Sequence, residues 1–213
     1  MSGVVRKLKV LHAELDACSA CSTMIGPVVH GPPVDSRVML IGQAPGVHEG
    51  ARAKPFAWTA GKTLFRWFQE ATGADEEKIR AAIYIAAVAR CFPGKAKGGG
   101  GDRPPSPPEI ERCRPFLAGE TRILKPELLL PVGSLAISEV LGKKGPLVDV
   151  VGGKQRVSYH GVECDMIALP HPSGASTWHR VEPGKTLLAH ALAEVAAHPA
   201  MLAALADVDP VRS

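Results

Sequence analysis

The sequence predicts an α/β protein with a doubly wound parallel sheet, and two observations support this fold class. Four short apolar runs lack polar alternation, as do strands that a parallel sheet buries on both faces. Segments with helical spacing of apolar residues separate these runs, and this alternation of strand and helix is typical of α/β folds. The four predicted strands lie at residues 38–41, 83–88, 127–132 and 166–169. Their spatial order does not follow from the pattern.

The first predicted strand follows a helix and ends in a glycine-rich turn. Residues 3–16 carry apolar side chains at helical spacing and lead directly into a C-S-A-C turn. After strand 38–41, Gly42 and the sequence Q-A-P-G bring bare backbone to the carboxyl end of the strand, where open α/β sheets bind ligands. A polar, irregular segment follows, and helical spacing resumes at 61–72 and in a short helix at 75–81.

A long loop separates the second half of the chain from the first. Glycine, proline and basic residues dominate residues 92–108, a length at which a structureless segment indicates function or disorder. A helix begins at Pro108 and Glu109, with proline early and an acidic side chain in the first turn. The remaining predicted elements are a helix at 134–141, a polar turn or hairpin at 148–161 that bends at Gly152 and Gly153, and a helix at 184–197 followed by a frayed tail.

Composition favours a single soluble domain. The 213 residues suffice for one sizeable core. The hydrophobic fraction of 46% is ordinary, and no apolar run approaches the roughly 18 to 20 residues of a membrane span. Residues 1–9 are basic but lack the apolar segment of a signal peptide, so we expect a cytoplasmic protein without membrane contact. We also expect a monomer. The net charge of +4 is compatible with a polyanionic partner and does not require one.

Four of the five cysteines suggest a metal centre. Cys18 and Cys21 have the C-x2-C spacing that lets two thiolates converge on one metal, and Cys91 and Cys113 flank the long loop. Four such thiolates fit either a tetrahedral zinc ion or an iron-sulfur cluster, and two unrelated pairs of free thiols are the alternative. Cys164, beside the fourth predicted strand, is expected to pack as a small hydrophobic residue.

Several short motifs, taken in order, resemble one known family. They are G-Q-A-P-G after the first strand, P-F-A-W-T-A-G-K-T-L, the cysteines, K-P-E-L-L-L-P-V-G-S-L-A, and H-P-S-G-A-S after the last strand. Over about residues 15–195 they resemble the uracil-DNA glycosylase superfamily, and most closely its iron-sulfur branch, family 4. The resemblance implies a three-layer α/β/α sandwich around a four-stranded parallel sheet. It also implies one domain over residues 1–213, with a core at about 15–198 and a tail at 199–213.

The resemblance implies a DNA repair enzyme that flips uracil out of DNA and hydrolyses its N-glycosidic bond, leaving an abasic site. The partner would be DNA containing uracil, duplex or single-stranded. Family 4 also carries a structural 4Fe-4S cluster, which here would fall on Cys18, Cys21, Cys91 and Cys113 and hold the loop at 92–108 against DNA. Zinc is the alternative metal.

The family motifs also assign roles at the predicted site. Phe56 would stack on the flipped base, and His171 would donate a hydrogen bond to the uracil O2 as negative charge develops there. Core packing is the competing interpretation for each. The expected substrate-binding residues are Gly42, Ala44, Phe56, Ala87 and Ser173, and the expected DNA contacts are Ser173, Gly174, Ala175, Ser176 and Arg103.

Three departures from the family pattern affect the expected chemistry. Gln43 stands where family 4 has glutamate, and Ala44 stands where another branch keeps an activating aspartate. Ala87 replaces the asparagine that reads uracil. Gln43 therefore joins the catalytic candidates, together with His48 and Glu49, which lie on the same loop and could position water or stabilise the sugar cation. The G-G-G-D-R stretch lacks the histidine with which one branch cross-links DNA, so no covalent adduct is expected.

Three other functions remain open on the sequence alone. Because the acidic activator and the uracil-reading asparagine are absent, the protein could bind uracil-containing or single-stranded DNA without catalysis, or excise a different base. A cytosolic metalloprotein with an unrelated small-molecule pocket would show no salt-dependent DNA binding. Turnover on a uracil oligonucleotide separates the enzyme from the binder.

Overall fold

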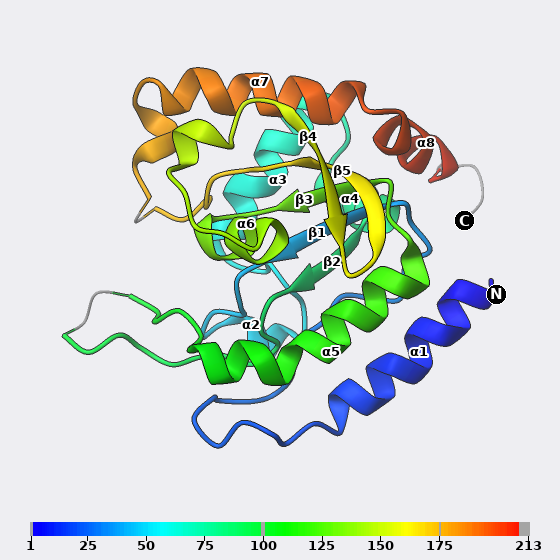
Figure 1. Ribbon diagram of the computed structural model, residues 1–213, viewed down its shortest axis with the longest axis vertical. Helices are drawn as coiled ribbons and strands as arrows, with labels where there is room; N and C mark the ends of the chain where they lie inside the picture. Colours follow the sequence, from blue (N-terminus) through cyan, green and yellow to red (C-terminus); the bar gives the residue numbers. More distant parts are fainter. Residues whose placement is uncertain (1, 99–100, 175, 209–213) are drawn as a thin grey trace.

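The computed structural model describes residues 2–98, 101–174 and 176–208. The fold has three layers, with a central sheet between two layers of helices (Figure 1). The sheet order is β2-β1-β3-β5-β4, with β1, β2, β3 and β5 parallel. The strands are β1 (Val38–Gly42), β2 (Tyr84–Ala87), β3 (Leu128–Pro131), β4 (Lys154–Tyr159) and β5 (Val162–Ile167). The α/β/α sandwich is therefore confirmed, although the sheet has five strands and not the expected four.

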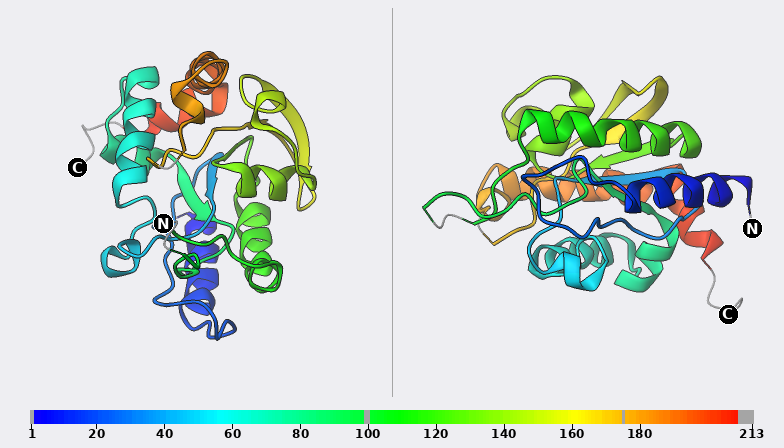
Figure 2. Two further views of the ribbon diagram at one scale, coloured as in Figure 1. Left: turned by 90° about the vertical axis from the view of Figure 1, so that its left-hand side faces the viewer. Right: turned by 90° about the horizontal axis from the view of Figure 1, so that it is seen from below.

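Helices cover both faces of the sheet (Figure 2). One layer contains α3, α4, α7 and α8, which contact one another, and the other contains α1, α5 and α6. The α-helices are α1 (Gly3–Asp16), α2 (Glu49–Arg52), α3 (Thr59–Thr72), α4 (Glu76–Ala82), α5 (Pro107–Leu124), α6 (Ser134–Leu141), α7 (Gly184–Ala197) and α8 (Pro199–Asp207), and short 3-10 turns lie at Leu147–Asp149 and Trp178–Arg180.

The additional strand, β4, pairs antiparallel with β5 at one edge of the sheet. Its residues alternate between exposed and more buried positions, as expected for a strand with one solvated face. This polarity made the segment resemble a turn in the sequence. The chain does bend at Gly152 and Gly153, but the prediction that the hairpin turns there was wrong. The hairpin turns at His160 and Gly161, both with positive φ.

The sequence predicted a frayed tail after the helix at 184–197, and this prediction is wrong for most of the tail residues that the structure describes. Residues 199–207 form α8, with a proline in the first turn and the His198 side chain accepting a hydrogen bond from the Ala200 amide at 3.2 Å. Met201 on this helix is fully buried. No single helix in the described ranges is long and apolar enough to cross a membrane, and α7 and α8 meet that test only as a pair bent by 60°.

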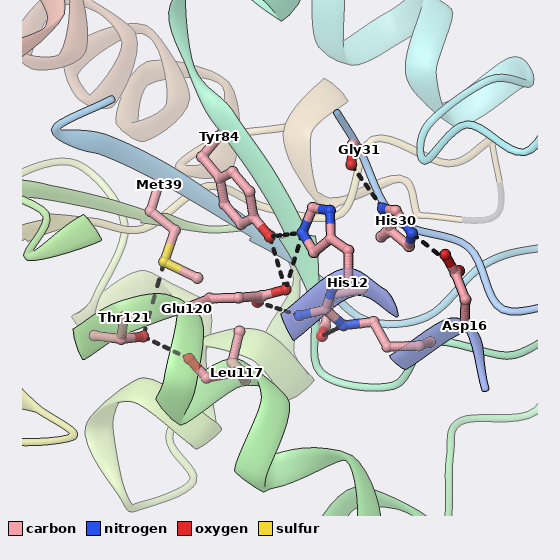
Figure 3. Close-up of polar contacts among 11 residues, drawn as sticks. His12, Asp16, His30, Gly31, Met39, Tyr84, Leu117, Glu120 and Thr121 are labelled. Carbon is pink, nitrogen blue, oxygen red and sulfur yellow. Dashed lines mark hydrogen bonds and ion pairs between the residues drawn. The ribbon is translucent and has the colours of Figure 1, made fainter. Parts of the chain in front are cut away.

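A buried polar network joins α1, β2 and α5 (Figure 3). The Arg90 guanidinium, just after β2, pairs with the Glu120 carboxylate on α5, and both side chains are at most 1% exposed. Glu120 also accepts a hydrogen bond from the Tyr84 hydroxyl at 2.7 Å. The Tyr84 hydroxyl oxygen lies 2.7 Å from His12 Nε2, and because its own proton goes to Glu120, His12 must be the donor. Burial lowers the pKa of His12 to about 4, which keeps this imidazole neutral.

Candidate active site

A cavity of about 430 Å³ opens at the carboxyl ends of β1 and β2. This is the edge at which open α/β sheets bind ligands. The cavity brings together most of the predicted site: Gly42, Gln43, Ala44, His48, Glu49, Phe56, Ala87, Arg103, His171 and Ser173 all line it. Gly174 and Ser176 do not line it, and Ala175 lies outside the described residues.

Phe56 lines the cavity in a constrained backbone conformation. Its φ of 54° is in the left-handed region, which is unfavourable for a bulky side chain. The Arg80 guanidinium fixes this turn by donating to the carbonyl oxygens of Pro55 and Phe56, each at 2.9 Å. A side chain on Gly61 would overlap the Phe56 carbonyl, and a Cβ on Gly42 would lie 2.8 Å from the Phe56 ring. The two glycines and Arg80 therefore hold the ring against the end of β1.

His171 follows β5 and is fixed in one tautomer. The Ser173 amide donates to His171 Nδ1 at 3.2 Å, so the proton of the neutral ring is on Nε2. Burial, with a smaller effect from His179, lowers the pKa of His171 and favours the neutral ring. Gly133 makes room for it, because a Cβ there would lie 3.0 Å from the imidazole. His171 thus offers one Nε2–H donor at the cavity.

The turn after β1 is anchored to the segment after β2. The Val88 amide donates to the Gly42 carbonyl at 2.9 Å, and the Ala89 amide donates to the Gln43 carbonyl at 3.0 Å. Each carbonyl therefore already accepts one bond. The Gln43 side-chain amide lines the cavity and makes no hydrogen bond to another described residue, so it is available to a ligand.

The Glu49 carboxylate links two backbone segments of the site. Its two carboxylate oxygens accept hydrogen bonds from the amides of Gly46 at 2.8 Å and Ala57 at 3.0 Å. These bonds join the turn after β1 to the segment that carries Phe56. Burial raises the pKa of Glu49 even though both amides favour the charged form.

Replacement Glu49→Gln tests this position, because its amide group cannot accept on both atoms. We expect a loss of about 1–3 kcal/mol in the free energy of unfolding at neutral pH. The raised pKa of Glu49 also determines how its contribution to stability changes with pH. The carboxyl contributes most below the pKa that it has in the unfolded chain, and its contribution falls as pH rises through the pKa that it has in the folded protein. Urea unfolding of the wild type and of Glu49→Gln, measured from below the unfolded pKa to above the folded pKa, should show a difference in stability that narrows with rising pH. A difference that widens would contradict the raised pKa.

The loop between β2 and α5 is a hairpin arm where the sequence predicted no regular structure (Figure 1). Lys95 and Asp102 face each other across it, with the ammonium 2.6 Å from the carboxylate. Arg103 donates to both carboxylate oxygens of Glu109, at 2.7 and 2.8 Å, which holds the pKa of Glu109 well below its usual range. The Arg103 guanidinium therefore anchors the arm, and its contact with DNA stays a prediction.

The four cysteines expected to bind a metal lie in one region. Backbone hydrogen bonds between Ile25 and Phe92, at 2.8 and 3.0 Å, place the segment after Cys21 beside Cys91. Burial, reinforced by Cys113, Cys18 and Cys21, raises the pKa of Cys91 to about 11. No group of three or more cysteine, histidine or acidic side chains in the described ranges has metal-coordinating geometry. Cys164 is fully buried, as predicted.

Comparison with known proteins identifies the family of this chain. Residues 28–196, well over half of the chain, match the family described as the uracil DNA glycosylase superfamily. The chain belongs to this superfamily. It is similar to the Type-4 uracil-DNA glycosylase of Thermotoga maritima, at 27% identity over 70% of this chain and 77% of that protein.

Two further superfamily members show how far the similarity extends. The Type-4 uracil-DNA glycosylase of Sulfurisphaera tokodaii is 28% identical over 66% of this chain, and the match spans less than two thirds of that protein, 61%. A Type-5 uracil-DNA glycosylase of Pyrobaculum aerophilum is 26% identical over 63% of this chain and 65% of that protein. The resemblance to family 4 is therefore confirmed.

From the sequence, no role at the cavity was assigned to three residues that shape it. Arg80 holds the Phe56 turn, Trp58 lies at the mouth of the cavity, and Asp102 reaches it from the hairpin arm. A Cβ on Gly46 would lie 3.3 Å from Asp102 Oδ2, so the arm closely approaches the turn after β1. Of the three, only Trp58 could have been found from the sequence, because a tryptophan in a polar segment between glycines is not expected to pack in the hydrophobic core.

Proposed function

We propose that this protein is a uracil-DNA glycosylase that hydrolyses the N-glycosidic bond of a flipped nucleotide. The arrangement of His171 carries the proposal, since its Nε2–H is the kind of donor that a departing uracil anion requires. The Phe56 ring in the same cavity supports it by offering a stacking face. Superfamily membership, and relatives named as uracil-DNA glycosylases, add support for the substrate.

In this mechanism the extruded base enters the cavity and stacks on Phe56. As the bond between the sugar and the base breaks, negative charge develops on the base, and His171 donates to the uracil O2. A donor that acts on charge present mainly in the transition state raises the rate more than the affinity. We assign to the Gln43 amide, which lines the cavity on the turn after β1, a contact with the base or the attacking water.

The water that attacks the sugar needs a polar partner. Two carboxylates line the described cavity, those of Glu49 and Asp102. Both oxygens of Glu49 already accept backbone amides, whereas Asp102 binds Lys95 through Oδ1 and directs Oδ2 toward Gly46. We therefore assign water positioning to Gln43 and Asp102 in preference to Glu49, and His48 packs its ring against Trp58.

We further propose that Cys18, Cys21, Cys91 and Cys113 hold a structural 4Fe-4S cluster. Support comes from the proximity of the other three thiols to Cys91, whose pKa they help to raise, and from the suitability of thiolates as cluster ligands. The cluster would tie α5, the arm and the N-terminal segment together and would take no part in bond cleavage. About four irons per chain with broad visible absorption is the expected result, and one zinc per chain without iron would contradict it. We also propose that the protein is a monomer in the cytoplasm.

One assay tests the range of activity. Purified protein is incubated with duplex and single-stranded oligonucleotides that contain uracil, hypoxanthine or a mismatched thymine, and abasic sites are cleaved with alkali. Cleavage at uracil is expected. Cleavage only at another base would assign a different specificity, and tight binding without cleavage would favour the non-catalytic DNA binder.

Replacement Phe56→Ala should weaken excision by removing the stacking face, at a cost of about 1–3 kcal/mol. The variant Phe56→Tyr, which keeps an aromatic face on the same turn, serves as the matched control. Single-turnover excision and thermal unfolding are measured for both. If folded Phe56→Ala excises uracil at the wild-type rate, Phe56 serves only core packing.

A further inference from the structure

An exposed tryptophan stands at the mouth of the cavity. Seven large hydrophobic side chains of the described chain are exposed, and two of them, Val47 and Trp58, line the cavity. Trp58 is the one aromatic residue among the seven and is 41% exposed. The other tryptophans differ, because Trp67 is buried and Trp178 is partly buried against the core. An exposed aromatic face beside a ligand cavity indicates a contact that the cavity interior does not supply.

The ring of Trp58 is held in place by two neighbours from another segment. The Arg52 guanidinium lies over the ring, 4.4 Å from its centre. The His48 ring centre is 4.5 Å from that of Trp58, at a tilt of 44°. Arg52 also donates to the His48 carbonyl at 3.2 Å, which links both neighbours in one short helix. The three side chains form a fixed cluster, called here the Trp58 platform.

The charge of the Trp58 platform is uncompensated in the described structure. Arg52 forms no ion pair with any described carboxylate, in contrast to Arg80, Arg103 and Arg114. A cation beside an exposed aromatic ring is the combination that binds single-stranded nucleic acid, where bases stack on the ring and the cation attracts phosphate. A purely apolar partner would leave this cation unpaired at its interface.

We propose that the Trp58 platform is a second stacking subsite that binds a nucleobase adjacent to the extruded nucleotide. Phe56 and Trp58 are two residues apart on one turn, so a base in the cavity and a base on the platform belong to the same short stretch of strand. Arg52 contacts the phosphate between or beside them. The inference deepens the proposed function, because it takes DNA as the ligand, but stacking on Trp58 does not require bond cleavage.

Tryptophan fluorescence tests the subsite without relying on excision. The probe is a single-stranded oligonucleotide with a tetrahydrofuran abasic analogue, which leaves no base for the cavity. Titration should quench the fluorescence of the wild-type protein. Trp58→Phe should abolish most of this quenching with little change in affinity, and Trp58→Ala should weaken binding about 5- to 150-fold, the range that one stacked base implies. Trp178→Phe is the matched control and should retain the quenching.

The phosphate contact has an independent test. Arg52→Gln should reduce the slope of log affinity against log salt by about 0.7, the value for one phosphate on a single strand. Arg66→Gln is the control, since Arg66 is an exposed arginine of α3 that pairs with Glu70 and does not line the cavity. An unchanged slope in Arg52→Gln would overturn the assignment of Arg52.

The outcomes distinguish this inference from the proposed function. Quenching that persists in Trp58→Phe, or wild-type affinity in a folded Trp58→Ala, would overturn the platform even if uracil excision is observed. Trp58-dependent quenching without any excision would support the platform and contradict the glycosylase. A thermal melt of each variant confirms that the affinities refer to folded protein.

Discussion

Replacement His171→Ala should lower the single-turnover rate of uracil excision by about 10²- to 10³-fold, with a much smaller change in substrate affinity. The fixed tautomer gives the reason. Ser173 occupies Nδ1, so Nε2–H is the donor available to an oxygen that gains charge only as the glycosidic bond breaks. Rate and dissociation constant must be measured separately, the first with enzyme in excess and the second by direct binding.

The matched control for this variant is His179→Ala. His179 is close enough to influence the pKa of His171, but it packs against Trp67, with ring centres 5.0 Å apart, and does not line the cavity. It should leave the rate near that of the wild type. Loss of affinity in proportion to rate in His171→Ala would instead assign His171 to DNA binding. Gln43→Ala should cost less than His171→Ala, and the reverse order would make Gln43 the decisive contact.

Replacement Glu120→Gln should destabilise the protein by about 3–5 kcal/mol, because it leaves the buried Arg90 charge without its partner. The Arg90 and Glu120 side chains are 1% and 0% exposed, and one Arg90 nitrogen, Nη1, already lacks a partner in the described structure. The free energy of unfolding in urea measures the effect. Glu111→Gln is the control, since it breaks an exposed pair with Arg114 and should cost no more than about 1 kcal/mol.

A second variant keeps this prediction informative if Glu120→Gln fails to fold. The double replacement of Arg90 by Met and Glu120 by Leu removes both charges and should recover much of the lost stability. A Glu120→Gln protein as stable as the wild type would show that the pair contributes little. Because Arg90 directly precedes Cys91, loss of the pair should also loosen the segment that carries this cysteine.

Most of the fold followed from hydrophobic pattern, and its exceptions have physical causes. Strands buried on both faces gave clear signals, whereas β4 is half solvated and its polar alternation resembled a turn. Helix α8 was missed because its alanine-rich sequence carries little amphipathic pattern, although Met201 is fully buried. The hairpin arm was missed because glycine-rich sequence indicates flexibility, while its pairing depends on Lys95 and Asp102 across the arm.

The site was partly predictable for the same reasons. His171 lies in a short motif directly after the fourth predicted strand, so its position at the strand ends followed from the sequence. Phe56 lies between the first predicted strand and the helix at 61–72, and the resemblance to the family motif is what assigned it to the site. The role of Arg80 did not, because it acts from α4 through bonds to backbone carbonyls distant in sequence. Glu49 was correctly placed on the cavity, but sequence cannot reveal that backbone amides occupy both its oxygens. Hydrogen bonds of this kind depend on tertiary contacts, which the sequence pattern does not show.

The most direct test of the central claim is the release of free uracil in a single turnover. Wild-type protein in excess over a uracil-containing oligonucleotide is sampled over time, and free uracil is quantified by mass spectrometry beside the abasic strand. We predict equimolar uracil and abasic product from the wild type, and a rate about 10²- to 10³-fold lower from His171→Ala. Oligonucleotide bound at saturation with no uracil released would contradict the proposed catalysis.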